Sequence, residues 1–403
     1  MITDADLRDR TKALLEVAHP DEVDQFTFRG EQFDRGLALV HFPEGLGGLN
    51  LPPKMQRIVA ETIQANAKRW YEDMALNPMG IGMAAPTLLT YASEAWKHRL
   101  LRPLYTGEEL WCQMFSEPGA GSDVAGLSTR AVRDGDDWII NGQKVWTSLA
   151  HMASWGLLVT RSDPSVPKHA GLTYFFIDMH LDGIEVRPLH QLTGEAEFNE
   201  VFFTDLRVPD QQRLGRVGDG WRVAITTLMN ERTSLGSGAS KGNAGPIHDL
   251  LRVWKNRDEI RMTAHEEAVL RDDITRLYIR ARIHQFTSAR ARDNREPGNP
   301  GPEFSIGKLA QAELEQEIHD LAIALLGPRA LTYEPGFERR RPDFNGLADL
   351  ETRMKRGWLR SQAYTIEGGT SDVMRNILGE RVLGLPGDVR VDRDVAWADV
   401  ARS

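Results

Sequence analysis

The chain has 403 residues, of which 41% are hydrophobic and one is a cysteine, and this length allows two or three domains with buried cores. Its formal charge of -9 and its pI near 5.7 argue against a general affinity for nucleic acid, because phosphate binding requires a surplus of lysine and arginine. Cys112 has no second cysteine with which to form an internal disulfide, so we expect a reducing compartment, with the cytoplasm as the default.

The sequence predicts neither a secretory signal nor a membrane span. The first 20 residues alternate charged and apolar side chains, whereas a signal peptide has a basic end followed by an apolar run. The longest apolar runs, such as residues 321–326, are far shorter than the roughly 20 residues that a spanning helix needs. We therefore expect a soluble protein without a membrane partner.

Residues up to about 110 show helical periodicity. Apolar positions recur at spacings of three and four in two stretches, namely Met55, Ile58, Val59, Thr62 and Ile63, and then Trp96, Leu100 and Leu104. Residues 43–50 (PEGLGGLN) interrupt this pattern. They contain three glycines, but the dinucleotide fingerprint is incomplete and no βαβ pattern follows, so a turn is predicted there.

Residues 109–218 have the short alternating segments that are typical of antiparallel strands. The clearest hairpin is predicted at residues 138–146, where Asn141-Gly142 would supply the positive φ angles of a tight two-residue turn. Further strands are expected at residues 155–160, 172–178, 184–188 and 200–204. This middle block therefore reads as a small β domain.

Helical periodicity returns from Gly220 onward, at residues 221–234, 265–292, 303–326 and 350–364. The order helical, β, helical predicts an α+β protein. We divide it into an N-terminal helical domain (1–110), a central antiparallel β domain (111–218), a C-terminal helical domain (219–386) and a tail (387–403).

Residues 114–126 (MFSEPGAGSDVAG) combine a short apolar strand with a glycine-rich turn. The turn at residues 116–123 brings several backbone amides and two hydroxyls close together. Such a turn can hold the polar edge of a ring and a phosphate.

This block resembles the signature of the acyl-CoA dehydrogenase family, with Phe115 where an aliphatic residue is more usual. Residues 140–148 (INGQKVWTS) resemble the family's second motif, and 199–209 resemble the strand that closes its β domain. Residues 366–372 and 375–381 resemble its final loop and helix, and the matches run in order from about residue 40 to 386.

The resemblance implies the family's fold, including a C-terminal four-helix bundle, with FAD as cofactor and an acyl-CoA as substrate. It further implies a role in fatty acid metabolism and β-oxidation, and an electron-transfer flavoprotein as partner. A homodimer or homotetramer is expected, possibly paired with a related subunit; neither a metal nor nucleic acid is expected.

The same resemblance assigns residues to the flavin. The backbone of Phe115 and Ser116 would meet the pyrimidine edge of the isoalloxazine ring, Trp146 would pack on the ring, and Ser148 would donate to flavin N5. Directed amides suit that edge because the reduced flavin gains negative charge near N1. Gly121 and Ser122 would also approach FAD, and Ser122 would approach the CoA as well. Thr370 and Asp372 would approach FAD too, and a helix N-cap is also predicted there.

The implied reaction is α,β-dehydrogenation of the thioester to the trans-2-enoyl-CoA, in which a glutamate removes the α-proton and the β-hydrogen leaves as hydride to N5. Many members carry this glutamate immediately before a Gly-Thr pair, but here Gly368 occupies that position and Glu367 lies one residue earlier. A second family arrangement places it before an arginine in the helix after the β domain, which matches Glu231 and Arg232.

We therefore predict Glu231 as the base and keep Glu367 as the alternative. Arg232 would hold the acyl-CoA or orient Glu231, and the amide of Gly368, beside Gly369, would donate to the thioester oxygen. Two other functions fit the same scaffold: an acyl-CoA oxidase or flavin monooxygenase that uses oxygen, and a non-catalytic flavin-binding subunit or DNA-interacting relative.

Overall fold

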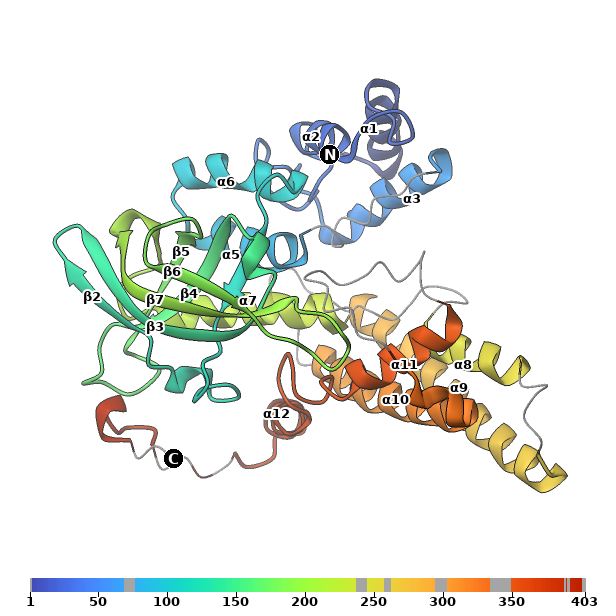
Figure 1. Ribbon diagram of the computed structural model, residues 1–403. Coiled ribbons are helices and arrows are strands. Elements are labelled where there is room, and N and C mark those ends of the chain that lie inside the picture. Colours follow the sequence, from blue (N-terminus) through green and yellow to red (C-terminus); the bar gives the residue numbers. More distant parts are fainter. Residues whose placement is uncertain are drawn as a thin grey trace. The chain divides into compact units, whose positions relative to one another are not determined.

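The computed structural model describes residues 2–68, 77–236, 245–256, 262–293, 303–333, 349–387, 389 and 392–400, and of residues 231–236, 292–293 and 303–304 it describes the backbone only. The chain forms two compact units (Figure 1). The first contains Met1–Arg187, Phe198–Asn230 and Val391–Ser403, and the second contains Pro188–Glu197 and Glu231–Arg390. The predicted division at residues 110, 218 and 386 stays a prediction.

The first unit begins with helices, as the periodicity predicted: α1 (Asp4–Val17), α2 (Gln25–Asp34), α3 (Gln56–Asn66), α5 (Ala85–Tyr91) and α6 (Glu94–Thr106). Side-chain caps define three of their starts, at Thr3, Asp24 and Ser93, which accept hydrogen bonds from amides of the first turn. Residues 43–50 form turns in which Gly45 and Gly47 have positive φ, as expected.

The middle of this unit is an eight-stranded sheet in the order β6-β7-β3-β2-β4-β5-β8, with β1 paired to β4. Its strands are β1 (Trp111–Met114), β2 (Arg130–Asp134), β3 (Asp137–Ser148), β4 (Trp155–Arg161), β5 (Leu172–Asp178), β6 (Ile184–Pro188), β7 (Phe198–Pro209) and β8 (Arg213–Leu214). The α+β class is thereby confirmed. The sheet is mostly antiparallel, but β1 pairs with β4 in parallel, and so does β2 at one residue pair.

The predicted tight turn at Asn141-Gly142 is wrong, because β3 runs unbroken from Asp137 to Ser148 and the hairpin turn lies at its start, around Gly135. Asn141 is held instead by Asp205 of β7, through a side-chain bond of 3.0 Å and a backbone bond of 2.9 Å. Gly142 lies at a register shift between β3 and β7, with φ +154°. The Asn-Gly pair therefore forms a β-bulge, which uses the same freedom of glycine as a turn does.

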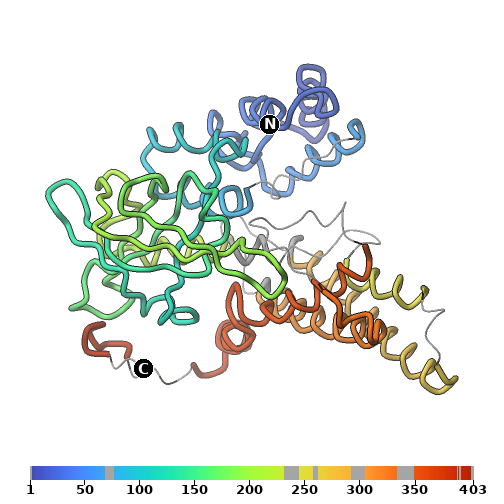
Figure 2. Tube along the Cα trace, in the orientation of Figure 1, coloured from blue at the N-terminus to red at the C-terminus, as the bar shows by residue number. Residues whose placement is uncertain are grey.

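Helix α7 (Gly220–Gly236) follows the sheet, and the second unit contains α8 (Pro246–Lys255), α9 (Ala264–Asp293), α10 (Glu303–Leu326), α11 (Leu350–Ser361) and α12 (Ser371–Ile377). The predicted helix 303–326 is confirmed, whereas the helix predicted to residue 364 ends at Ser361 and continues as turns to residue 368. Apolar residues of α8, α9, α10 and α11 share one core. The Cα trace of these helices is drawn in Figure 2.

The loop Pro188–Glu197 between β6 and β7 belongs to the second unit. Glu195, which is buried, forms an ion pair with Arg356 of α11, and Tyr333 donates its hydroxyl to the Thr193 carbonyl. In the part of the chain that the structure describes, no helix is both long enough and apolar enough to cross a membrane.

Candidate functional site

The strand β1 delivers residues 115 and 116 to the side of β3. The carbonyl of Phe115 accepts a hydrogen bond from Lys144 Nζ at 3.0 Å, and the carbonyl of Ser116 accepts one from the Val145 amide at 2.9 Å. The ring of Phe115 is buried edge-on against Tyr174, at 5.8 Å between centroids. The side chain of Phe115 is therefore part of the core, and the backbone role that the resemblance assigns to this residue stays a prediction.

The glycine-rich turn that follows is closed by its own backbone hydrogen bonds and has free space around its glycines. Glu117 and Ala120 exchange two backbone hydrogen bonds of 3.0 Å. A Cβ atom added at Gly119 or Gly121 would meet no atom within 4 Å, and Ser122 is exposed. The backbone of the turn is therefore open to a bound group at Gly119, Gly121 and Ser122, whereas the amides of Glu117 and Ala120 are already engaged.

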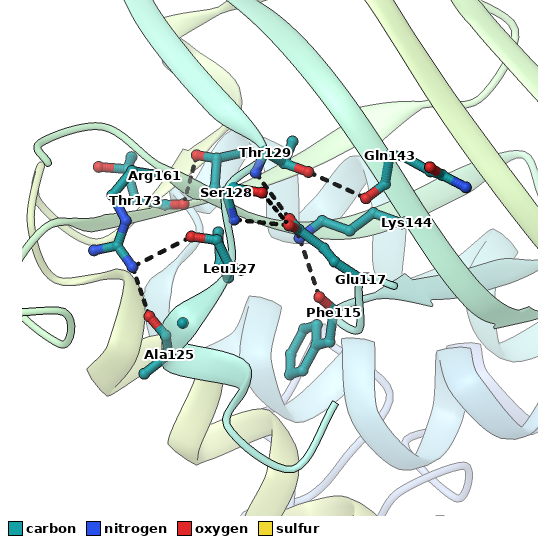
Figure 3. Close-up of polar contacts among 12 residues, drawn as sticks. Phe115, Glu117, Ala125, Leu127, Ser128, Thr129, Gln143, Lys144, Arg161 and Thr173 are labelled. Atoms are coloured by element: carbon teal, nitrogen blue, oxygen red, sulfur yellow. Dashed lines mark hydrogen bonds and ion pairs between the residues drawn. The ribbon is translucent and has the colours of Figure 1, made fainter. Parts of the chain in front are cut away.

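Glu117, a residue of this turn, forms a buried ion pair with Lys144 of β3 (Figure 3). Lys144 Nζ lies 2.8 Å from Glu117 Oε1, and the side chains of the two residues are 0% and 6% exposed. Burial alone would raise the pKa of Glu117, but the charge and hydrogen bond of Lys144, with bonds from Thr129 and Ser128, outweigh it and lower this pKa to about 2. Glu117 is thus a charged structural carboxylate and unsuited to act as a base near neutral pH.

Trp146 stands out in β3 by its backbone and its exposure. Its φ is +61° at a second register shift between β3 and β7, and 61% of the residue is exposed. A left-handed backbone costs a bulky L-residue about 1–2 kcal/mol, and such outliers gather at functional sites. Its ring meets Phe198 edge-on at 6.1 Å, which leaves most of the indole surface free to pack on a planar ligand.

Ser148 is the last residue of β3, lies opposite Phe198 in β7, and is partly exposed. The next residue, Leu149, again has a positive φ of +57°, so the chain turns sharply away there. The hydroxyl of Ser148 therefore lies two residues from the exposed indole of Trp146, at the end of the same strand.

The segment 392–400 returns to the end of the glycine-rich motif in the first unit. Trp397 donates its indole N–H to the Gly126 carbonyl at 3.1 Å. Lys168 joins Asp123 of the motif to Asp392, at 2.8 and 2.6 Å. The predicted tail thus contacts the motif, which the sequence did not indicate.

In the second unit, the predicted substrate loop precedes α12. Gly368 and Gly369 have φ angles of +62° and +95°, and Lys308 of α10 donates to the carbonyls of Tyr364 at 2.8 Å and Gly369 at 2.6 Å. Thr370 caps α12 by accepting from the Val373 amide, so the N-cap predicted there is confirmed, whereas Asp372 is not the cap. Asp372 lies in the first turn with a side chain that is 91% exposed.

The two candidate bases differ in what the structure describes. Glu367 forms an ion pair of 2.7 Å with the buried Arg360, which gives its carboxylate a structural partner. The side chains of Glu231 and Arg232, both in α7, lie outside the described residues.

The structure adds three lysine or glutamate residues to the predicted set, namely Glu117, Lys144 and Lys308. A signal for Lys144 was present, because it has the inward parity of Trp138 and Ile140 in β3, and a lysine on an inward face indicates a buried partner. Nothing comparable marks Lys308, whose acceptors are backbone carbonyls far away in the sequence.

The residues of the first unit fit a flavin. They offer a turn with exposed backbone at Gly119, Gly121 and Ser122, backbone groups fixed beside β3, and an exposed indole two residues before a hydroxyl. The pyrimidine edge of a flavin needs directed donors, its ring needs an aromatic or apolar surface, and its pyrophosphate needs amides.

Comparison with known families and sequences gives a consistent result. Residues 112–206 match the acyl-CoA dehydrogenase middle domain, and residues 218–383 match the acyl-CoA dehydrogenase C-terminal domain. The chain is 34% identical to the acyl-CoA dehydrogenase IpdE1 of Mycobacterium tuberculosis, over 88% of this chain and 86% of that protein. It is 36% identical to the acyl-CoA dehydrogenase FadE34 of the same organism, again over 88% of this chain, but spans only 45% of that longer protein.

A similar solved structure is the ChsE4-ChsE5 complex from Mycobacterium tuberculosis. The superposition has a TM-score of 0.69 and 25% sequence identity, and it covers 96% of this chain and 97% of the matched one. Fold, sequence and motif positions therefore point to the same family.

Proposed function

This chain belongs to the acyl-CoA dehydrogenase family, and from that premise we propose that it oxidises an acyl-CoA to the trans-2-enoyl-CoA with Glu231 as the base. The family's members are FAD-dependent oxidoreductases, and this chain is one of them. The observation that carries the proposed site is the strained, exposed Trp146 beside the backbone of residues 115 and 116.

FAD, when bound, supplies the acceptor for the β-hydrogen and its electron pair. We assign the backbone of Phe115 and Ser116 to the pyrimidine edge, Trp146 to the ring face, and Ser148 to a hydrogen bond at N5. Gly121 and Ser122 are assigned to the pyrophosphate side, because the turn there is exposed. These groups bind and orient the ring before any bond is broken.

The thioester requires a donor at its carbonyl oxygen and a base at its α-carbon. We assign the donor to the amide of Gly368, with Gly369 beside it, because Lys308 fixes the loop that carries both. Since the α-proton is weakly acidic, the donor must stabilise enolate character while Glu231 removes the proton. Arg232 is assigned to the acyl-CoA or to Glu231, and Thr370 and Asp372 to FAD.

Glu231 is preferred to Glu367 on two grounds. A general base must be free to reach a substrate proton, and Glu367 is already paired with Arg360 at 2.7 Å. The position before the Gly-Thr pair is taken by Gly368, while the alternative position before an arginine carries Glu231.

The test is a pair of variants with the same chemical change. Glu231→Gln should retain FAD but reduce turnover about 10²- to 10⁴-fold, which is the usual contribution of a positioned base. Glu367→Gln is the matched control and should keep most activity. The measurement is anaerobic bleaching of the flavin by straight-chain, branched and sterol-derived acyl-CoAs. Full activity of the first variant, or no bleaching of the wild type, would sink the proposal.

We propose an electron-transfer flavoprotein as acceptor and the cytoplasm as location. The cytoplasmic location is supported by the single cysteine, Cys112, which is buried and forms no disulfide. Slow reoxidation of the reduced enzyme in air would support an electron-transfer flavoprotein as acceptor, whereas fast reoxidation would point to an oxidase.

We also propose that the chain assembles into a homodimer or homotetramer, or pairs with a related chain, through α9. Ile279, Ile283 and Phe286 recur there at spacings of four and three, and they are 51%, 57% and 64% exposed. A chain of the ChsE4-ChsE5 complex, a two-protein assembly by its name, has the same fold. Light scattering on Phe286→Glu tests this, and an unchanged mass would argue against α9 as the interface.

A further inference from the structure

Lys144 is buried more completely than a lysine normally is. Its side chain is 0% exposed, although burial disfavours the charged form and lowers the pKa of this ammonium against the opposing effect of Glu117. The cost of burying a cation is offset only by good partners, and Lys144 Nζ has Glu117 Oε1 at 2.8 Å and the Phe115 carbonyl at 3.0 Å.

The partner carboxylate is fixed as firmly as the lysine. Glu117 Oε2 accepts from the Ser128 amide at 2.7 Å and the Ser128 hydroxyl at 2.8 Å, while Oε1 also accepts from the Thr129 amide at 2.9 Å (Figure 3). With both oxygens engaged by the backbone after the motif, Glu117 cannot swing away. The ammonium of Lys144 is thereby held at one point.

The Phe115 carbonyl shares its peptide plane with the Ser116 N–H. The peptide bonds of the described residues are trans, so these two groups point in opposite directions. Since the carbonyl points inward to Lys144, the Ser116 N–H points away from it, and Ser116 is partly exposed. The Ser116 carbonyl is held in turn by the Val145 amide at 2.9 Å, so the next peptide plane is fixed as well.

We propose that Lys144, held by Glu117, is a positioning residue for FAD: it anchors the Phe115 carbonyl and thereby aims and polarises the Ser116 N–H toward the pyrimidine edge of the flavin. This inference rests on the proposed function, which assigns that edge to residues 115 and 116. A cation on the carbonyl draws electron density along the peptide, which strengthens the N–H as a donor. The stronger donor stabilises the negative charge that a reduced flavin carries near N1.

The experiment separates positioning from stability. Lys144→Met removes both contacts but leaves Glu117 buried without its cation, so this variant can fail to fold. The double variant Lys144→Met/Glu117→Gln removes the charges together and leaves one amide oxygen, which can still accept from the amide and hydroxyl of Ser128. Replacing both charges of a buried pair is often close to neutral for stability.

The matched control is Arg29→Met. Arg29 is a cation of the first unit that is 1% exposed and donates to a backbone carbonyl, that of Tyr105, at 3.2 Å. It tests the loss of a buried cation-to-carbonyl contact outside the motif. For all variants the readouts are the Kd of the apoprotein for FAD, the visible flavin spectrum, and the midpoint potential of the bound flavin.

We expect the double variant to bind FAD at least tenfold more weakly and to show a more negative midpoint potential with a shifted spectrum, while Arg29→Met keeps wild-type values. A double variant that folds and keeps the wild-type Kd and potential would overturn the proposal, and so would an equal change in Arg29→Met. The proposed function fails separately, if wild-type protein with bound FAD is not bleached by any acyl-CoA.

Discussion

Two loops of this protein are assigned to the two halves of one reaction, and each is held by a buried lysine in a different way. In the first unit, Lys144 donates a hydrogen bond to the Phe115 carbonyl and forms an ion pair with Glu117. In the second unit, Lys308 donates hydrogen bonds to two carbonyls, those of Tyr364 and Gly369. The backbone between these residues is thereby held as a loop around the ammonium.

The difference concerns which property of the loop is fixed. The carboxylate of Glu117 ties Lys144 to residues 128 and 129, directly before β2, so the charge and the backbone are fixed together. The carbonyls held by Lys308 carry no net charge and do not titrate, and the segment 364–369 that they bound ends in two glycines with positive φ, Gly368 and Gly369. In the first loop, charges and backbone are therefore held in place together. In the second loop, only the backbone conformation is held.

The largest effect should follow from breaking the first lysine contact. Lys144→Met leaves a buried carboxylate without its cation, and we expect a loss of about 3–5 kcal/mol in the free energy of unfolding of the first unit. Urea unfolding followed by tryptophan fluorescence measures it. If the double variant with Glu117→Gln were no more stable than Lys144→Met alone, the loss would not come from the unpaired charge.

Acid should distinguish the two loops. The pKa of Glu117 is about 2 in the folded chain against an ordinary value of 4.5, so its stabilisation is complete above pH 4.5 and is lost as the pH falls from there toward 2. The expected difference is on the order of 3 kcal/mol. Unfolding of wild type and Glu117→Gln between pH 7 and 2.5 measures it. Parallel pH profiles for the two proteins would contradict the assignment.

A smaller effect is expected from Lys308→Met, which leaves two partly buried carbonyls without this donor. We expect a loss of about 1–3 kcal/mol, together with faster amide exchange at residues 367–371 and weaker acyl-CoA binding. Lys355→Met is the control, because Lys355 is also buried in the second unit but contacts Thr332 instead of this loop. Equal exchange at residues 367–371 in both variants would show that Lys308 does not hold the loop.

The smallest effect, of opposite sign, is expected at Trp146. Glycine adopts a φ of +61° without strain, so Trp146→Gly should leave the apoprotein unchanged or stabilise it by about 1 kcal/mol, while the affinity for FAD falls. Thermal unfolding without FAD and titration with FAD measure the two effects. A variant that is clearly destabilised without FAD would mean that the indole is a packing residue of the fold.

Much of the architecture followed from periodicity. Helix α10 has the predicted bounds, and the strands around residues 155–160 and 172–178 formed where alternation and turn residues placed them. The hairpin at Asn141-Gly142 failed because the dipeptide signals a positive φ but does not say whether the chain turns or bulges there. That choice depends on β7, which pairs with β3. Asp205 of β7 lies 64 residues after Asn141 in the sequence and contacts it directly.

The sequence by itself determined the family and the cofactor, because both are carried by short ordered blocks such as residues 114–126 and 140–148. Only the tertiary structure decided what supports them. Lys144 reaches Phe115 across 29 residues, Lys308 reaches Gly369 across 61, and Trp397 reaches Gly126 across 271. A buried cation can be suspected from its position on an inward face, but its acceptor is a backbone carbonyl, which every residue has, so only the folded chain shows which one it binds.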